Sequence, residues 1–127
     1  MAEGFGATIA GVDLCRVAYL VGTIYGMALP SAHRASHGIF YTPPELAEQL
    51  LLMAEDAGVS WNTARVLDPA CGGGAFLLPV LRRMINSMKD ADPTFILQQI
   101  STRLRGFDVD PFGAWLAQAM CEIEVAA

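Results

Sequence analysis

Apolar positions follow the helical period over most of this chain. The pattern predicts a first helix from Thr8 to Leu29, ended by Pro30 because proline cannot donate the backbone hydrogen bond that continues a helix. Residues 31–38 are polar and close with glycine, and we expect a linker there. A second helix should follow Thr42, with Thr42 as its N-cap and Glu45 as the capping-box partner.

Two short apolar runs predict β-strands, Ala64–Asp68 and Arg105–Asp108, and the first should be buried. Between them lies the glycine-rich turn Pro69–Gly74, followed by residues with helical spacing. A strand, a turn, a helix and a second strand form a right-handed crossover unit with parallel strands. The order of elements therefore predicts an α/β fold.

Helical spacing predicts three more helices after the first strand. Asp92 and Asp110 each precede a proline and should cap the second and third of these helices. Pro79 should kink the first, unless that helix begins later than its apolar spacing indicates. The predicted ranges are residues 75–88, 93–104 and 112–122.

Composition and charge narrow the possible functions. The chain has 127 residues, enough for one domain or part of one, and 54% of them are hydrophobic against 17% charged. This excludes disorder and predicts apolar surface that must be covered by a partner surface. The net charge is −5 and the basic residues form no stripe, so we expect any DNA contact to come from outside this chain.

The sequence argues against a metal site, a disulfide framework and a membrane-spanning helix. The three cysteines lie far apart without a CxxC pair, which argues against a disulfide framework or zinc site and favours a reducing cytoplasm. His33 and His37 are four residues apart, but Arg34 stands where an HExxH site needs glutamate. The uncharged run Val17–Leu29 has thirteen residues, fewer than the roughly 20 of a membrane span, so we expect a buried helix and no membrane partner.

The strand ends carry the candidate chemistry. Ligands of crossover units sit at the carboxyl ends of the strands, where Asp108 could accept hydrogen bonds from a ribose diol. A dinucleotide fingerprint beginning at Gly72 would need a glycine where this chain has Leu77. Asp68, directly before the turn, would disfavour a pyrophosphate but suit the ammonium of a methionine moiety. These features favour S-adenosylmethionine as the cofactor.

Three segments carry a family resemblance. VLDPACGGGAFLLPVL resembles motif I of N6-adenine DNA methyltransferases, RGFDVDP is similar to their motif II, and GIFYTPPELAEQLL is similar to the preceding motif X. They occur in the family's order and span Gly38 to about Leu116. The resemblance implies a class I, Rossmann-like methyltransferase core that transfers methyl to adenine in DNA, as in restriction-modification systems.

The same resemblance assigns roles to residues. Tyr41, Thr42 and Pro43 would pack on the methionine end of the cofactor, and Asp68 would hold its amino group. Asp108 would take the ribose hydroxyls. The full set of expected cofactor-binding residues is Tyr41, Thr42, Pro43, Asp68, Pro69, Ala70, Cys71, Gly72, Gly74, Phe76, Asp108 and Val109, the last covering one face of the adenine.

The family's catalytic motif, (D/N/S)PP(Y/F), is not found in this sequence. In it, the polar side chain and a proline carbonyl accept from the target amino group, and the aromatic ring stacks on the flipped adenine. Pro43-Pro44 follows Thr42 and belongs to motif X, whereas Asp110-Pro111-Phe112 has one proline and lies in motif II. We therefore expect no catalytic residue in this chain.

Two strands cannot form a stable open sheet, since their edges and faces stay uncovered. We expect an incomplete core of about two parallel strands with flanking helices over residues 38–127, preceded by a helical segment and linker over residues 1–37. The chain would be the N-terminal piece of a longer methylase, through truncation, a split gene or a frameshift. Alone it should be marginally folded and inactive.

Three alternatives stay open. The chain could be a non-catalytic cofactor-binding or partner subunit that completes its sheet with a second polypeptide. It could be a nicotinamide-binding domain, which Leu77 disfavours. It could also be a membrane-associated protein led by the Val17–Leu29 run.

Overall fold

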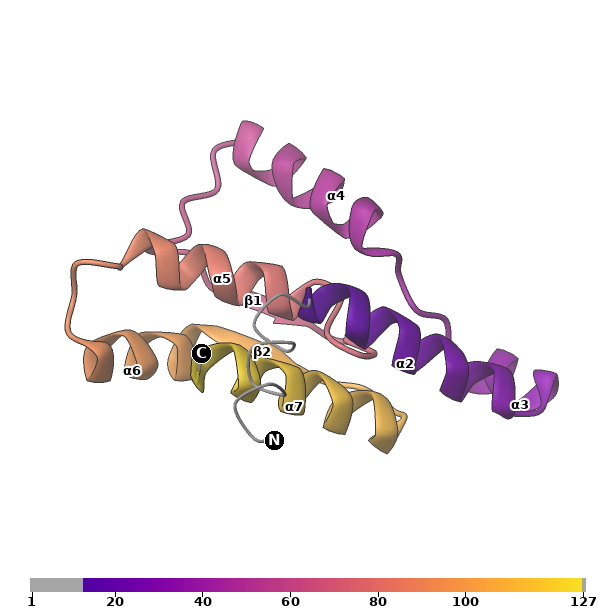
Figure 1. The fold of residues 1–127 in the computed structure, drawn as a ribbon. Helices are drawn as coiled ribbons and strands as arrows, with labels where there is room; N and C mark the ends of the chain where they lie inside the picture. The colour runs from indigo at the N-terminus through magenta and orange to yellow at the C-terminus, as the bar shows by residue number, and fades with distance from the viewer. Residues whose placement is uncertain (1–12, 127) are drawn as a thin grey trace.

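The computed structural model describes residues 13–126, which form six α-helices and a two-stranded sheet (Figure 1). Strand β1 (Val66–Asp68) pairs in parallel with β2 (Leu104–Gly106), with Val66 opposite Leu104 and Asp68 opposite Gly106. The crossover between the strands consists of α5 (Leu77–Ser87) and α6 (Pro93–Arg103). The predicted pair of parallel strands joined through helices is therefore confirmed.

The other four helices lie before β1 and after β2. They are α2 (Leu14–Ala28), α3 (Ser31–His37), α4 (Pro44–Asp56) and α7 (Pro111–Ala126). Helix α7 packs against both α5 and α2, whereas α4 stands on the other side of α5 in Figure 1. No helix among residues 13–126 is long and apolar enough to cross a membrane.

The core consists of two clusters, one that joins α5 to α4 and one that joins α5 to α7. Leu78, Leu81 and Met84 of α5 and Leu116 of α7 are almost completely buried. By contrast, β1 is not the buried strand that its apolar residues predict, because Leu67 is 60% exposed. Among the described residues β1 is hydrogen-bonded only to β2, so one of its edges stays open.

The N-terminal third differs from the sequence prediction in two places. Residues 8–12 of the predicted first helix lie outside the described residues, and α2 begins at Leu14 with the Asp13 side chain as its cap. The predicted linker over residues 31–38 is wrong, since Ser31–His37 form α3. Pro30 ends one helix and, with its fixed φ, precedes the next, while Gly38 ends α3 in the left-handed region at φ 62°.

The predicted capping box at Thr42 is also wrong. Helix α4 begins at Pro44, its N-cap is Pro43, and no side chain caps it. The residue before a proline is disfavoured in the helical region, so Pro43 stays extended and shifts the helix start by one residue. Glu45 instead forms an exposed ion pair with Arg16 of α2, at 2.7 Å.

The caps predicted at the other prolines are confirmed. Asp92 accepts from the backbone N–H groups of Thr94 and Phe95, and Asp110 accepts from Gly113. Pro79 does not interrupt α5, because the helix begins at Leu77 and proline in a first turn removes no intrahelical bond.

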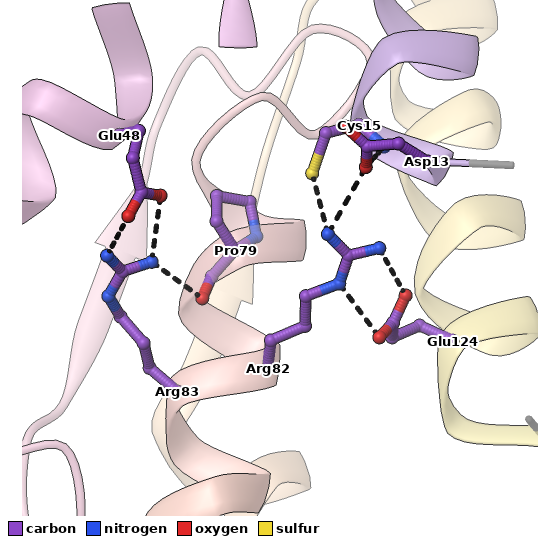
Figure 2. Close-up of polar contacts among 7 residues, drawn as sticks. All are labelled: Asp13, Cys15, Glu48, Pro79, Arg82, Arg83 and Glu124. Carbon is purple, nitrogen blue, oxygen red and sulfur yellow. Dashed lines mark hydrogen bonds and ion pairs between the residues drawn. The ribbon is translucent and has the colours of Figure 1, made fainter. Parts of the chain in front are cut away.

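Two adjacent arginines of α5 connect it to helices on both sides (Figure 2). The Arg82 guanidinium donates to both carboxylate oxygens of Glu124 on α7, at 2.8 and 2.9 Å, and to Asp13 before α2. Arg83 donates to Glu48 and Glu55 of α4. These contacts hold α2, α4 and α7 around the middle of α5, the helix that follows the glycine-rich turn.

Candidate cofactor site

The turn between β1 and α5 is held in place by β2. The backbone N–H of Phe107 donates to the Asp68 carbonyl, and the N–H of Cys71 donates to the Phe107 carbonyl, both at 2.9 Å. The Asp68 carboxylate accepts from the backbone N–H of Ala70 at 3.1 Å. The pairing of the two strands thus continues past their ends and brings the turn beside residues 107–108.

Asp108 joins this turn to the start of α7. One of its carboxylate oxygens accepts from the backbone N–H of Gly72 at 2.7 Å, and the other accepts from Asp110 at 2.8 Å. Hydrogen bonds to a charged acceptor are stronger than those between neutral groups. Asp108 therefore holds the turn after β1 beside the start of α7.

Two cavities lie at these strand ends and share a wall. The first, of about 80 Å³, lies beside Asp68, and the second, of about 150 Å³, lies beside Asp108 and Val109. The residues that line both are Phe40, Tyr41, Ala70 and Gly72. The arrangement is a divided site with the Asp68 carboxylate in the first half and the carboxylates of Asp108 and Asp110 in the second.

Ten of the twelve residues expected from the sequence line one of these cavities. The two that do not are Pro43, which forms the N-cap of α4, and Gly74. A Cβ on Gly74 would come within 3.3 Å of Ala117, so this glycine allows the turn to pack on α7. The part that each of the twelve plays in binding stays a prediction.

Several lining residues escaped the sequence reasoning. Cys15, Ala18 and Tyr19 of α2 line the first cavity, although they lie about 20 residues before motif X. The available signal was the pair Gly22 and Gly26, because these small residues mark a face of α2 that is buried. The other lining residues outside the expected twelve lie within the motifs, except His37 and Gly113: His37, Gly38, Ile39, Phe40, Pro44, Gly73, Ala75, Asp110 and Gly113.

Asp110 is 7% exposed and anchors α2 to the second cavity. The Tyr25 hydroxyl donates to its carboxylate at 3.1 Å, and the Tyr25 ring stacks on Phe112 with centroids 4.0 Å apart. Burial, together with the hydrogen bond to Asp110, raises the pKa of Tyr25. The interaction holds α2 against the first turn of α7.

Tyr41 in the shared wall and Cys71 in the first cavity are both neutral at physiological pH. Burial, followed by the nearby negative charge of Asp110, raises the pKa of Tyr41 to about 12. Burial and the carboxylates of Asp68 and Asp108 raise the pKa of Cys71 to about 11. Cys71 is therefore a thiol and not a nucleophilic thiolate. The site offers carboxylate acceptors, backbone groups and aromatic surface, which suit binding.

Comparison with known proteins identifies the family of this chain. A family model described as N-6 DNA methylase matches residues 17–121. The chain is also 38% identical over 72 residues to the type II restriction enzyme and methyltransferase RM.BcgI of Heyndrickxia coagulans. That alignment covers 57% of this chain and 10% of the relative, so the chain spans about a tenth of that protein's length. No solved structure matches. Since the family model covers more than half of the chain, the chain belongs to the N-6 DNA methylase family.

Proposed function

We propose that this chain forms the S-adenosylmethionine-binding part of a DNA adenine N6-methyltransferase with a Rossmann-like core. The observation that carries the proposal is the divided site, in which Asp68 at the end of β1 and Asp108, two residues after the end of β2, lie on either side of Tyr41 and Gly72. The Asp68 carboxylate in the first half and the Asp108 carboxylate in the second suit a ligand that has an ammonium at one end and a ribose at the other.

The first cavity suits the methionine end of the cofactor. The Asp68 carboxylate accepts from Ala70 and retains acceptor sites for an ammonium group. The neighbouring Cys71 thiol and Tyr41 hydroxyl stay neutral, so Asp68 keeps its electrostatic preference for a cation. The same carboxylate disfavours the pyrophosphate of a nicotinamide cofactor.

The second cavity suits the adenosine end. Each Asp108 oxygen accepts one backbone hydrogen bond, and a carboxylate offers about four acceptor sites, so ribose hydroxyls can still be bound. Val109 is 75% exposed beside it and provides apolar surface for one face of the adenine. The backbone bonds to Gly72 and Asp110 hold Asp108 in position before the ligand arrives.

The cofactor would supply a methyl group carried on a sulfonium, and this chain would bind and orient it. The (D/N/S)PP(Y/F) motif, which would receive the target adenine, is not found in these 127 residues, and the net charge of −5 does not favour DNA. We propose that catalytic and DNA-contacting residues come from other sequence and that this chain alone is inactive.

The outer edges of β1 and β2 favour pairing with further strands. An apolar groove along β1 is lined by Leu51, Val66 and Leu67, and another along β2 is lined by Leu104 and Cys121, among other residues. We propose that strands from the same or a second polypeptide complete the sheet there. The alternative function, a non-catalytic subunit of a split methylase, rests on the same grooves.

Two assays test the proposal. In calorimetric titration, S-adenosylmethionine should bind the purified chain and NAD⁺ should not, and Asp68→Asn should weaken binding about tenfold or more. Asp56→Asn, at an exposed aspartate that lines neither cavity, is the matched control. With tritiated cofactor, the chain alone should transfer no methyl to adenine-containing DNA. Preferential binding of NAD⁺ would contradict the assignment of the cofactor. Methyl transfer by the chain alone would contradict the proposal that the chain alone is inactive.

A further inference from the structure

The Tyr41 ring lies against the backbone of α2 at Gly22. A Cβ atom on Gly22 would overlap ring carbons Cγ, Cδ1 and Cε1 of Tyr41. Gly22 itself is buried. Only a residue without a side chain therefore allows the ring to occupy this position.

The glycine-rich turn lies close to the same ring. A Cβ on Gly73 would be 3.4 Å from Tyr41 Cε1, and one on Gly72 would be 3.8 Å from Cδ1. Gly73 also approaches α2 directly, since its Cβ would be 3.5 Å from the Ala18 carbonyl oxygen. The ring is thus packed against both α2 and the turn.

We propose that Gly22 is a positioning residue for the cofactor site, because the absence of its side chain sets where the Tyr41 ring stands. Tyr41 lines both cavities, so its position determines the shape of both halves. The effect on cofactor binding rests on the proposed function, whereas the effect on the position of the ring does not.

The choice of residue in α2 agrees with this role. Glycine is unfavourable inside a helix, where alanine is the best residue. Gly22 lies in the middle of the fifteen-residue α2, far from either cap. Gly26, also buried and one turn later, differs in its surroundings: its Cβ would be 3.9 Å from Tyr41 Cε2, an ordinary van der Waals distance. The two glycines therefore form a matched pair for mutation.

The test compares Gly22→Ala with Gly26→Ala in the full chain. Nuclear Overhauser contacts between the Tyr41 ring protons and the α-protons of Gly73 report the position of the ring without any cofactor. Calorimetric titration with S-adenosylmethionine reports the site. Gly22→Ala should abolish the ring contacts and weaken binding at least tenfold, whereas Gly26→Ala should preserve both. In a Tyr41→Ala background, Gly22→Ala should have no further effect on affinity.

Each outcome decides the proposal. Ring contacts and affinity in Gly22→Ala equal to those of the unsubstituted chain would overturn it. So would a full additional loss of affinity when Gly22→Ala is added to Tyr41→Ala. If Gly22→Ala alone fails to fold, Tyr41→Ala must restore folding, and failure to do so also refutes it. If the unsubstituted chain does not bind the cofactor, the proposed function fails, but the ring contacts still decide the role of Gly22.

Discussion

Replacing Asp108 with asparagine should weaken both the fold and the site. Its two carboxylate oxygens accept from the backbone N–H groups of Gly72 and Asp110. Asparagine has one acceptor oxygen and one amide that only donates, so one of these N–H groups loses its partner. The turn would no longer be fixed to the start of α7.

The magnitude follows from the lost hydrogen bond. A bond to a charged group contributes about 1.5–3 kcal/mol, and we take the lower value because Asp108 is partly exposed. The entropy of unfolding is about 2.1 cal/mol/K per residue, so the melting temperature of this chain should fall by about 6 °C. Affinity for an adenosine-containing ligand should fall more than tenfold, because the ribose hydroxyls lose a charged acceptor.

Differential scanning calorimetry measures the change in melting temperature, and calorimetric titration measures the change in affinity. Asp90→Asn, an exposed aspartate in the turn before α6, is the control and should leave the melting temperature unchanged. The reasoning is refuted if Asp108→Asn has the same melting temperature as the unsubstituted chain, because the two hydrogen bonds from backbone N–H groups to Asp108 would then contribute nothing to stability.

The remaining predictions concern Glu55 and Cys71. Hydrogen bonds from Arg83 and then Trp61 lower the pKa of Glu55 below its ordinary value of 4.5, so its contribution to stability is present above pH 4.5 and is lost as the pH falls further. Glu55→Gln should therefore show a weaker decrease in urea midpoint below pH 4.5, and an identical decrease would contradict the ion pair. Cys71 is 5% exposed with a pKa of about 11, so mass spectrometry should find iodoacetamide labelling at pH 7.5 slow in the native chain and fast after denaturation; fast native labelling would disprove its burial.

The sequence predicted the end of β1 at Asp68 correctly but placed the end of β2 at Asp108, two residues after its actual end at Gly106. The signals for the carboxylates beside these ends are local. Asp68 and Asp108 each follow a short apolar run, and the glycines after Asp68 mark the turn that brings the backbone to a ligand. The caps at Asp92 and Asp110 are equally local, since the proline that follows each aspartate marks the first turn of the helix. The carboxylates of Asp68 and Asp108 accordingly line the two cavities.

Contacts between distant segments could not be predicted from local patterns. The packing of Tyr41 on Gly22 and the bonds from Arg83 to Glu48 depend on how the helices are placed in space. The burial of Leu67 was mispredicted for a related reason. Its apolar character indicates a buried position, but it faces the open groove along β1. The apolar character of a strand residue indicates that its side chain should be covered, but it does not identify the segment that covers it.

The central claim, that the ends of β1 and β2 hold the cofactor, is tested most directly by titrating S-adenosylmethionine into isotopically labelled chain and following backbone amide shifts. We predict saturable changes at Tyr41, at residues 70–74 and at Asp108 and Val109, while the amides of α6, which line neither cavity, stay unchanged. Saturable changes confined to other segments, or no changes at millimolar cofactor, would contradict the assignment of this site.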